Sequence, residues 1–155
     1  MKQKLKMKQS IVDDEFWTPK SLYDDICKKY NIYPLLDAAA NPDNSKCLHH
    51  LSDALHQEWF AYGAICDVWC NPPHSKTEEF IRRAEIQHIK YGMRIMMIVP
   101  ANILSTKVWH ELIEDKREYH AIEGRPKFLK HGVPSKFPSR NAYVIILWNK
   151  VSENT

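Results

Sequence analysis

The stretch Ile95-Met96-Met97-Ile98-Val99 places five apolar side chains in a row. A strand with one face in water alternates apolar and polar residues, so an unbroken apolar run predicts a strand that is covered on both faces. Strands of this kind belong to sheets that carry helices on both sides. We therefore expect residues 95–99 to form a strand in the middle of an α/β domain.

The segments on either side of this strand alternate between helix and strand patterns. Apolar residues at helical spacing predict helices at 19–30, at 78–91 with Ile89 on the inner side, and from Thr106 to Ile113. Thr18 is the expected N-cap of the first helix, with Pro19 at its first position. Further strands are expected at 33–36, 65–70, 119–122 and 142–148, with a loop at 41–47. The pattern predicts an α/β fold, a small single domain with helices on both faces of a mostly parallel sheet.

Length and composition agree with one globular domain of 155 residues, of which 44% are hydrophobic and 26% charged. We expect a basic arm at 1–14, the folded domain at 15–150 and a short tail at 151–155. The arm carries four lysines and either touches a partner or only increases solubility. No apolar run is long enough for a membrane span and no secretory signal precedes the domain, so we expect a cytoplasmic protein without a membrane partner.

The composition also argues against several kinds of site. The four glycines stand far apart, which excludes GxGxxG motifs and phosphate-cradling loops. The four cysteines form no CxxC pair, and the Cys-x-His and Cys-x3-Cys spacings at Cys47 and Cys70 do not fit common zinc sites. We therefore expect reduced cysteines and no metal. A net charge of +3 permits a nucleic-acid partner without implying one.

Two polar segments fall at the ends of predicted strands. Asp37-Ala38-Ala39-Ala40 follows the strand at 33–36, and Asn71-Pro72-Pro73-His74 follows the strand at 65–70. Since proline has no backbone N–H donor, the second segment must leave the sheet as a loop. In open α/β sheets, ligands bind beyond the carboxyl ends of the strands. These two segments are therefore the first candidates for a functional site.

The segment Asn71-Pro72-Pro73-His74 resembles the [DNS]-P-P-[YFW] motif of methyltransferases that act on amino groups with S-adenosylmethionine. Further segments match in the same order: Phe16-Trp17-Thr18-Pro19, Asp37-Ala38-Ala39-Ala40, Val99-Pro100-Ala101 before Trp109, and 124–128. Together they resemble the phage-type, Dam-like DNA N6-adenine methyltransferase family over residues 15–148. The resemblance implies a Rossmann-like S-adenosylmethionine-dependent methyltransferase fold, S-adenosylmethionine as cofactor and double-stranded DNA as partner. A phage-encoded enzyme of this family would work in the host cytoplasm.

The resemblance assigns catalysis to Asn71, Pro72, Pro73 and His74. The exocyclic amine of adenine is a poor nucleophile because its lone pair is delocalised into the ring. The Asn71 side-chain oxygen and the Pro72 carbonyl would accept its two N–H bonds from a loop that the prolines stiffen. The adenine would be flipped out of the duplex, and His74, where the family has an aromatic residue, would stack on it. The alternative is a simple turn at 71–73 followed by an exposed loop histidine.

The resemblance also implies a set of cofactor-binding residues. Asp37 matches a position near the methionine half of S-adenosylmethionine and would accept from the ammonium group, unless it only caps its loop. Trp17 either packs against the cofactor or belongs to the core, and Asp53 either contacts the cofactor or caps a short helix. The full set is Trp17, Thr18, Pro19, Asp37, Ala38, Ala39 and Asp53, in which the alanines replace a flexible turn.

Basic residues near the motifs predict a surface for DNA phosphates. They are Lys76 after the catalytic loop and, in a stretch without acidic residues at 124–140, Arg125, Lys127, Lys130, Lys136 and Arg140. The alternative is a basic loop that is merely solvated. A separate recognition domain does not fit in 155 residues. Sequence specificity would therefore come from loops, from the basic arm or from the partner in a homodimer.

These observations predict a DNA adenine-N6 methyltransferase that moves a methyl group from S-adenosylmethionine to a flipped adenine. Two other classes stay open. One is a catalytically inactive DNA- or cofactor-binding protein of the same fold. The other is a methyltransferase that acts on a different amine, such as cytosine N4 or an RNA base.

Overall fold

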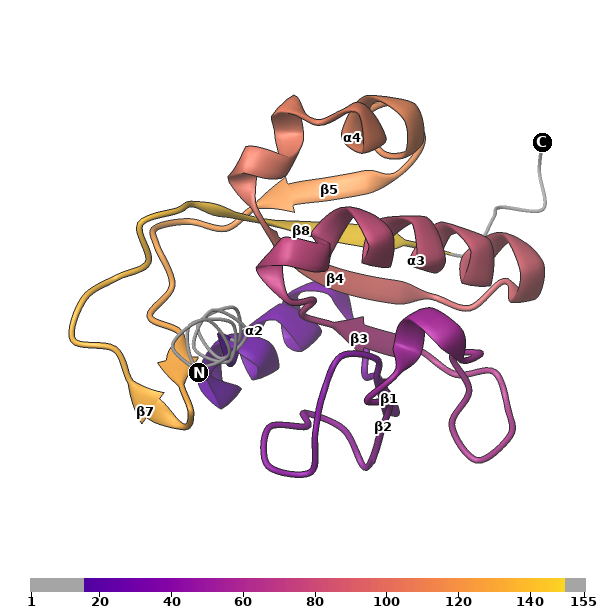
Figure 1. Ribbon diagram of the computed structural model, residues 1–155, viewed down its shortest axis with the longest axis horizontal. Helices are drawn as coiled ribbons and strands as arrows, with labels where there is room; N and C mark the ends of the chain where they lie inside the picture. Colours follow the sequence, from indigo (N-terminus) through magenta and orange to yellow (C-terminus); the bar gives the residue numbers. More distant parts are fainter. Residues whose placement is uncertain (1–15, 150–155) are drawn as a thin grey trace, which may run out of the picture.

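The computed structural model describes residues 16–149, so the predicted arm at 1–14 and the tail at 151–155 lie outside the described residues. Six strands form one sheet in the order β2-β1-β3-β4-β8-β5 (Figure 1). β1 to β4 run parallel, and β8 is antiparallel to both of its neighbours, β4 and β5. The strands are β1 (Leu36–Asp37), β2 (His49–His50), β3 (Val68–Cys70), β4 (Ile95–Pro100), β5 (Glu118–Ala121) and β8 (Tyr143–Trp148). The predicted α/β fold with a mostly parallel sheet is confirmed.

Two separate cores lie on the two faces of this sheet. Ile95, Met97 and Val99 of β4 pack with α3 (Thr77–Tyr91) and α4 (Lys107–Leu112), whereas Met96 and Ile98 pack with α2 (Lys20–Tyr30). Figure 1 shows α3 running alongside β4 and β8. All six residues of β4 are buried, because each face of the strand has a helix against it. The prediction from the apolar run at 95–99 is confirmed.

The predicted starts of two strands are too early, because they include residues that are exposed at the surface and form no strand pair with the sheet. Tyr33 and Leu35 are 63% and 49% exposed, and β1 pairs with its neighbours only at Leu36 and Asp37. β3 begins at Val68 rather than at Ile65, which is exposed. Ile89 is exposed on the outer side of α3, so the prediction that it faces inward is wrong. Periodicity alone had placed it at the margin of the apolar stripe.

The threonines at the starts of the predicted helices have different outcomes. Thr106, expected to open its helix, accepts a hydrogen bond at Oγ1 from the backbone N–H of Trp109 and caps α4. Thr77 is not a cap, because it is the first residue of α3 and Lys76 takes the cap position. Thr18 does not cap α2, which begins at Lys20 with Pro19 in the cap position and without a side-chain cap. The Thr18 hydroxyl is used elsewhere, as an acceptor for Asn71.

Short 3-10 helices and a second, two-stranded sheet complete the described chain. The 3-10 helices are η1 (Ala54–His56), η2 (His74–Lys76) and η3 (Ala101–Ser105). The small sheet is a hairpin of β6 (Leu129–Lys130) and β7 (Val133–Pro134), which the sequence patterns did not predict. Within residues 16–149, every helix is too short or too polar to cross a membrane.

The hairpin is attached to the segment that precedes α2. Trp17 and Leu129 exchange two backbone hydrogen bonds of 2.8 Å each, so residue 17 pairs with β6. The hairpin turn contains Gly132 at φ +78°, and a Cβ there would lie 3.2 Å from the Trp17 ring. The turn therefore needs glycine both for its left-handed backbone and for the close approach of Trp17.

Replacing Gly132 with alanine should loosen this contact. We expect Gly132→Ala to lower the free energy of unfolding by about 1–2 kcal/mol, from the left-handed φ plus the clash with Trp17. Gly124→Ala is the matched control, because Gly124 has φ +74° but nothing within 4 Å of its Cβ site. Urea unfolding of both variants measures the difference. Equal losses would show that the Trp17 contact does not constrain the turn.

Candidate active site

The strand order creates a crevice between the carboxyl ends of β1 and β3. The chain leaves β1 to form β2 on one side and returns to form β3 on the other, so the two connections diverge at this point. In open α/β sheets such a switch point is where ligands bind. A cavity of about 180 Å³ lies there. Its wall is formed by residues 16–18, 37–41, 44, 46 and 52 together with 69, 71–73 and 80.

Asn71 is held from the segment before α2. Its amide nitrogen donates to the backbone carbonyl of Phe16 at 2.6 Å and to Thr18 Oγ1 at 3.0 Å. Because a carbonyl oxygen can only accept, the Phe16 contact fixes which way the amide faces. Among residues 16–149, nothing donates to Asn71 Oδ1. The amide therefore presents its oxygen as an acceptor at the cavity wall, which it lines between the two strand ends.

Asp37 places a buried carboxylate on the opposite part of the wall. Only 3% of the residue is exposed, and its oxygens accept from the backbone N–H groups of Ala39 at 3.2 Å and Lys46 at 3.0 Å. Burial raises the pKa of Asp37 to about 6, although these two donors and the Lys46 charge oppose the shift. Within the described part of the chain, no cation lies in ion-pair contact with it.

The loop at 41–46 is fixed by its own asparagines. Asn41 Oδ1 accepts from the backbone N–H groups of Asp43 and Asn44, and Asn44 Oδ1 accepts from the backbone N–H of Asn41 at 2.8 Å. Asn41, Asn44 and Lys46 all line the cavity. Reciprocal side-chain bonds thus order a loop that contains no glycine, and this explains how the chain builds a cavity wall without a glycine-rich turn.

His74 does not line the cavity. Its ring stacks on Phe16 at 4.7 Å between centroids and 18° between planes, and its Nε2 lies 3.3 Å from the hydroxyl of Tyr143. Phe16 is one of four aromatic residues on the wall, with Trp17, Trp69 and Phe80. The stack with Phe16 uses one face of the imidazole and Tyr143 engages its edge, and the contact of His74 with a bound base stays a prediction.

Other predicted cofactor residues divide into two groups. Trp17, Thr18, Asp37, Ala38 and Ala39 line the cavity together with Asn71, Pro72 and Pro73. Pro19 and Asp53 do not. Pro19 begins α2, and Asp53 is exposed at the start of η1, where its Oδ1 lies 2.8 Å from Nδ1 of His56. Ser52 lines the cavity next to it.

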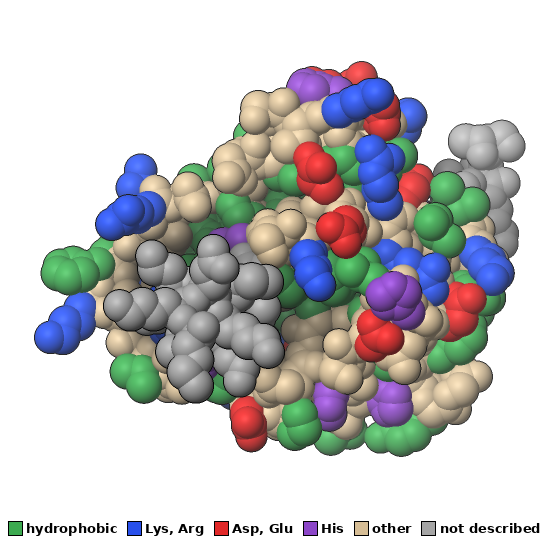
Figure 2. All heavy atoms as spheres, viewed as in Figure 1, with side chains coloured by type: hydrophobic (Ala, Val, Ile, Leu, Met, Phe, Trp, Pro, Cys, Tyr) green, Lys and Arg blue, Asp and Glu red, His purple; other side chains and the backbone are tan. Residues whose placement is uncertain are grey.

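The predicted phosphate-binding residues lie on the surface around the hairpin. Arg125, Lys127, Lys130, Lys136 and Arg140 are all exposed. Figure 2 shows Lys and Arg side chains gathered at the left of the molecule, where Figure 1 draws the hairpin and the loop that follows it. Among residues 16–149, no acidic side chain forms an ion pair with Arg125, Lys127, Lys136 or Arg140. Phe137, 75% exposed, stands among them.

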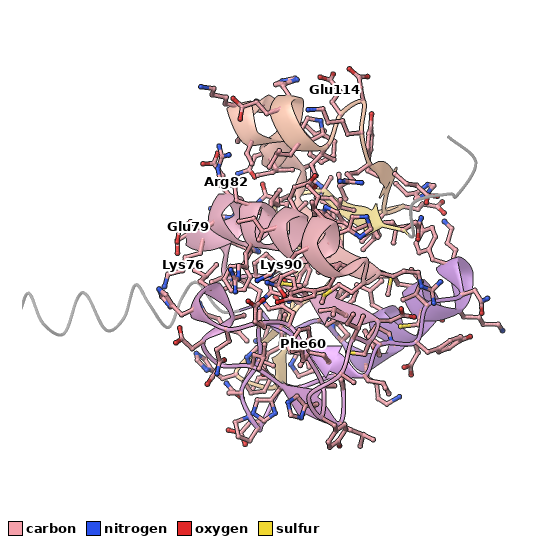
Figure 3. The ribbon with its side chains drawn as sticks, turned by 90° about the vertical axis from the view of Figure 1, so that its right-hand side faces the viewer. Phe60, Lys76, Glu79, Arg82, Lys90 and Glu114 are labelled. Carbon is pink, nitrogen blue, oxygen red and sulfur yellow. The ribbon has the colours of Figure 1, made fainter. Side chains whose placement is uncertain are left out.

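The remaining cations near the catalytic loop differ in their surroundings. Lys76 is exposed at the end of η2 and projects from the edge of the molecule (Figure 3). Arg82 lies 3.7 Å from Glu111, and Arg83 donates to the carbonyl of Gln57 at 2.7 Å. These two arginines are thus already engaged within the fold.

Cysteine and metal chemistry find little support in the geometry. Burial raises the pKa of Cys47 to about 12 and that of Cys70 well above its usual range, so both thiols stay protonated and poorly nucleophilic. All four cysteines are free. Within residues 16–149, no three His, Cys, Asp or Glu side chains lie together as metal ligands would.

A cavity at the switch point of an α/β sheet, with an oriented amide on one side and a buried carboxylate on the other, defines an α/β protein with a site for a small polar ligand. The family model described as DNA N-6-adenine-methyltransferase (Dam) matches residues 5–155, and the chain belongs to this family. A DNA N-6-adenine-methyltransferase of Escherichia phage T1 is 31% identical over 93 residues, which cover 59% of this chain and 37% of the phage T1 protein. The chain thus matches little more than a third of that relative's length. No solved structure matches this chain.

The raised pKa of Asp37 predicts how stability depends on pH. The folded protein binds this proton more tightly than the unfolded chain, so the stability it contributes is present below about pH 4 and is lost as pH rises through about 6. Asp37→Asn removes the titration. Between about pH 4.5 and about pH 8, we expect the wild type to lose about 2 kcal/mol of unfolding free energy relative to Asp37→Asn. Urea unfolding at several pH values measures this, and parallel pH curves would contradict it.

Proposed function

We propose that this chain transfers a methyl group from S-adenosylmethionine to the N6 amine of adenine in double-stranded DNA. Membership of the Dam family supports the reaction class. The observation that carries the proposal to particular residues is the fixed orientation of Asn71, whose Oδ1 is left as an acceptor beside the cavity at the ends of β1 and β3. The sheet order and the position of the cavity support a Rossmann-like methyltransferase fold.

Asn71 Oδ1 and the Pro72 carbonyl would accept the two N–H bonds of the adenine amine. These contacts favour a pyramidal nitrogen, whose lone pair is then available to attack a methyl carbon. The new N–C bond would form as the sulfur–methyl bond breaks and leaves S-adenosylhomocysteine, and the amine would then release one proton to water, giving N6-methyladenine. Because Phe16 and Thr18 already hold the amide, it needs little reorientation during the reaction.

The cavity fits the amino-acid end of S-adenosylmethionine, which when bound supplies an electrophilic methyl group. Asp37 is a buried carboxylate that no cation among residues 16–149 contacts directly, and an ammonium group of the ligand would complete it. Ala38, Ala39 and Trp17 add an apolar wall, and Thr18 borders both halves of the site. Pro19 and Asp53 are left out of the proposed cofactor contacts because they do not line the cavity.

In this proposal the ring that stacks on an extruded adenine is that of Phe16 rather than that of His74. A base must leave the duplex to reach a recessed amide, and an aromatic face at the wall favours it by stacking. Phe16 lines the cavity, and the His74 ring stacks on the Phe16 ring and so helps to hold it in place. His74 therefore acts as a positioning residue in this proposal.

DNA would lie across the basic surface around the hairpin. The exposed side chains of Arg125, Lys127, Lys130, Lys136 and Arg140 provide phosphate contacts, and Lys76 adds one near the catalytic loop. The hairpin pairs with Trp17, which lines the cavity, so this surface is continuous with the active site. The proposed place of action is the cytoplasm, that of the host for a phage-encoded protein, and a homodimer is one proposed source of sequence specificity.

Transfer of a labelled methyl group to unmethylated DNA, followed by digestion to nucleosides, tests the reaction itself. We expect the label in N6-methyldeoxyadenosine. Label in N4-methyldeoxycytidine would assign the protein to another amine. Absence of label on DNA and RNA, with binding of S-adenosylhomocysteine retained, would identify an inactive binding protein of the same fold.

Removing the Asn71 amide should affect turnover far more than cofactor binding. We expect Asn71→Ala to lower the rate of methyl transfer by about 10²–10³-fold, by analogy with the loss of one oriented polar group in other active sites. Its affinity for S-adenosylhomocysteine, measured by calorimetry, should stay within about threefold. Asn102→Ala, at an exposed asparagine of η3, is the matched control. Near-normal turnover of Asn71→Ala would show that the loop is only a turn.

The basic surface predicts a salt dependence of DNA binding. Each phosphate contact that is lost should reduce the log–log slope of affinity against salt by about 0.9. The triple variant Arg125→Ala/Lys127→Ala/Lys136→Ala should therefore bind with a slope that is flatter by up to about 2.7. The control removes the same charge from Arg82, Lys90 and Lys107, which lie close to acidic partners. Equal slopes for the two triple variants would place the DNA elsewhere.

A further inference from the structure

We propose that Lys46 binds the carboxylate of the cofactor's amino-acid end while Asp37 binds its ammonium group, so that the two side chains together select a zwitterion. This rests on the proposed function and deepens it, because it assigns a specificity-determining role to a residue that neither the sequence motifs nor the family resemblance pointed to.

Lys46 is held beside Asp37 by the backbone. The N–H of Lys46 donates to Asp37 Oδ2 at 3.0 Å, which fixes the origin of the lysine side chain next to the buried carboxylate. Both residues line the cavity. The Lys46 Nζ nevertheless does not pair with Asp37: within the described residues it forms no ion pair, and it donates to the carbonyl of Asn44 at 3.2 Å. One of its three N–H groups is thus used, on a neighbour that also lines the cavity.

Two opposite charges therefore share one cavity without neutralising each other by contact. Lys46 is half-buried and Asp37 is almost fully buried, so both have lost part of their hydration. Burial lowers the pKa of Lys46, as expected for an ammonium group that water reaches poorly. A charged group that gives up water without gaining an ionic partner is costly, and a ligand that carries the complementary charge removes the cost.

The ligand that satisfies both groups carries an ammonium and a carboxylate on the same carbon, as an α-amino acid does. The methionine end of S-adenosylmethionine has this arrangement, with one carbon between the two groups. The loop at 41–46 presents Lys46 in a defined place because Asn41 and Asn44 bond each other reciprocally. The lysine is thus prepared before the ligand arrives, which reduces the entropy lost on binding.

Ligands that lack one charge at a time test this assignment. S-adenosylhomocysteine carries both groups, its decarboxylated analogue carries only the ammonium, and 5′-methylthioadenosine carries neither. Calorimetric titrations of all three into the full-length wild type and into Lys46→Met form a double-mutant cycle between the side chain and the carboxylate. Lys28→Met, at an exposed lysine of α2, is the control for loss of a positive charge.

We expect Lys46→Met to weaken S-adenosylhomocysteine binding by about 10- to 100-fold, the worth of one charge-assisted contact. The decarboxylated analogue should bind the wild type and Lys46→Met with affinities that agree within about threefold, which also shows that the variant keeps an intact site. Asp37→Asn should weaken both ammonium-bearing ligands and leave 5′-methylthioadenosine nearly unaffected. Lys28→Met should change none of the three.

Two results would overturn the proposal. If Lys46→Met weakened S-adenosylhomocysteine and the decarboxylated analogue equally, Lys46 would only support the loop. If it weakened neither, Lys46 would not reach the ligand. Either result leaves the proposed methyltransferase function standing so long as the wild type binds S-adenosylhomocysteine, whereas a wild type that binds none of the three ligands would remove both.

Discussion

The hydrogen bonds from the Asn71 amide to the Phe16 carbonyl and the Thr18 hydroxyl join two parts of the chain that are 55 and 53 residues apart. They connect the loop after β3 to the segment before α2, and each side depends on the other. The amide gains a fixed orientation, since the Phe16 carbonyl can only accept and therefore needs the amide nitrogen. In return, Phe16 is held with its ring at the cavity wall. Without this connection, the site would lack an oriented acceptor, and the Phe16 ring would not be held at the wall.

The same segment links the site to the basic surface. Trp17 pairs with Leu129 of the hairpin, and Gly132 in the hairpin turn lies against the Trp17 ring. Phe128, beside Leu129, packs on Tyr143 at 4.6 Å between ring centroids, and the Tyr143 hydroxyl lies next to His74. Residues 16 and 17 thus contact the catalytic loop on one side and the hairpin on the other. This arrangement gives a physical reason for the family motif around Trp17 and the motif at 124–128 to occur in one protein.

Sequence patterns predicted those parts of the fold and site that depend on local chemistry. The apolar run at 95–99 identified the central strand, and its alternating contacts with the two cores explain why the run is unbroken. Asp37 and Asn71 were found because they follow predicted strands directly, where the sheet itself fixes the position of the next residue. Thr106 was placed at the start of its helix because that signal depends only on local sequence, and its side chain caps α4.

Features that depend on contacts distant in sequence escaped prediction. Thr18 has the local pattern of an N-cap, but Asn71 recruits its hydroxyl. His74 has a ring suited to stacking, but Phe16 occupies it. Asp53 follows a plausible motif position, yet the chain carries it to the surface beside His56. Lys46 lies in a stretch that reads only as a turn-rich loop, nine residues after Asp37, so no local pattern pointed toward the cavity.

A crystal structure of the protein with S-adenosylhomocysteine tests the central claim most directly, that the crevice between β1 and β3 holds the cofactor beside Asn71. The account predicts the ligand's ammonium group in hydrogen-bond contact with Asp37. It also predicts the ligand's sulfur facing the space in front of Asn71 Oδ1, with the amide still held by Phe16 and Thr18. A ligand bound away from this crevice, or an Asn71 side chain that turns its oxygen toward Thr18, would contradict it.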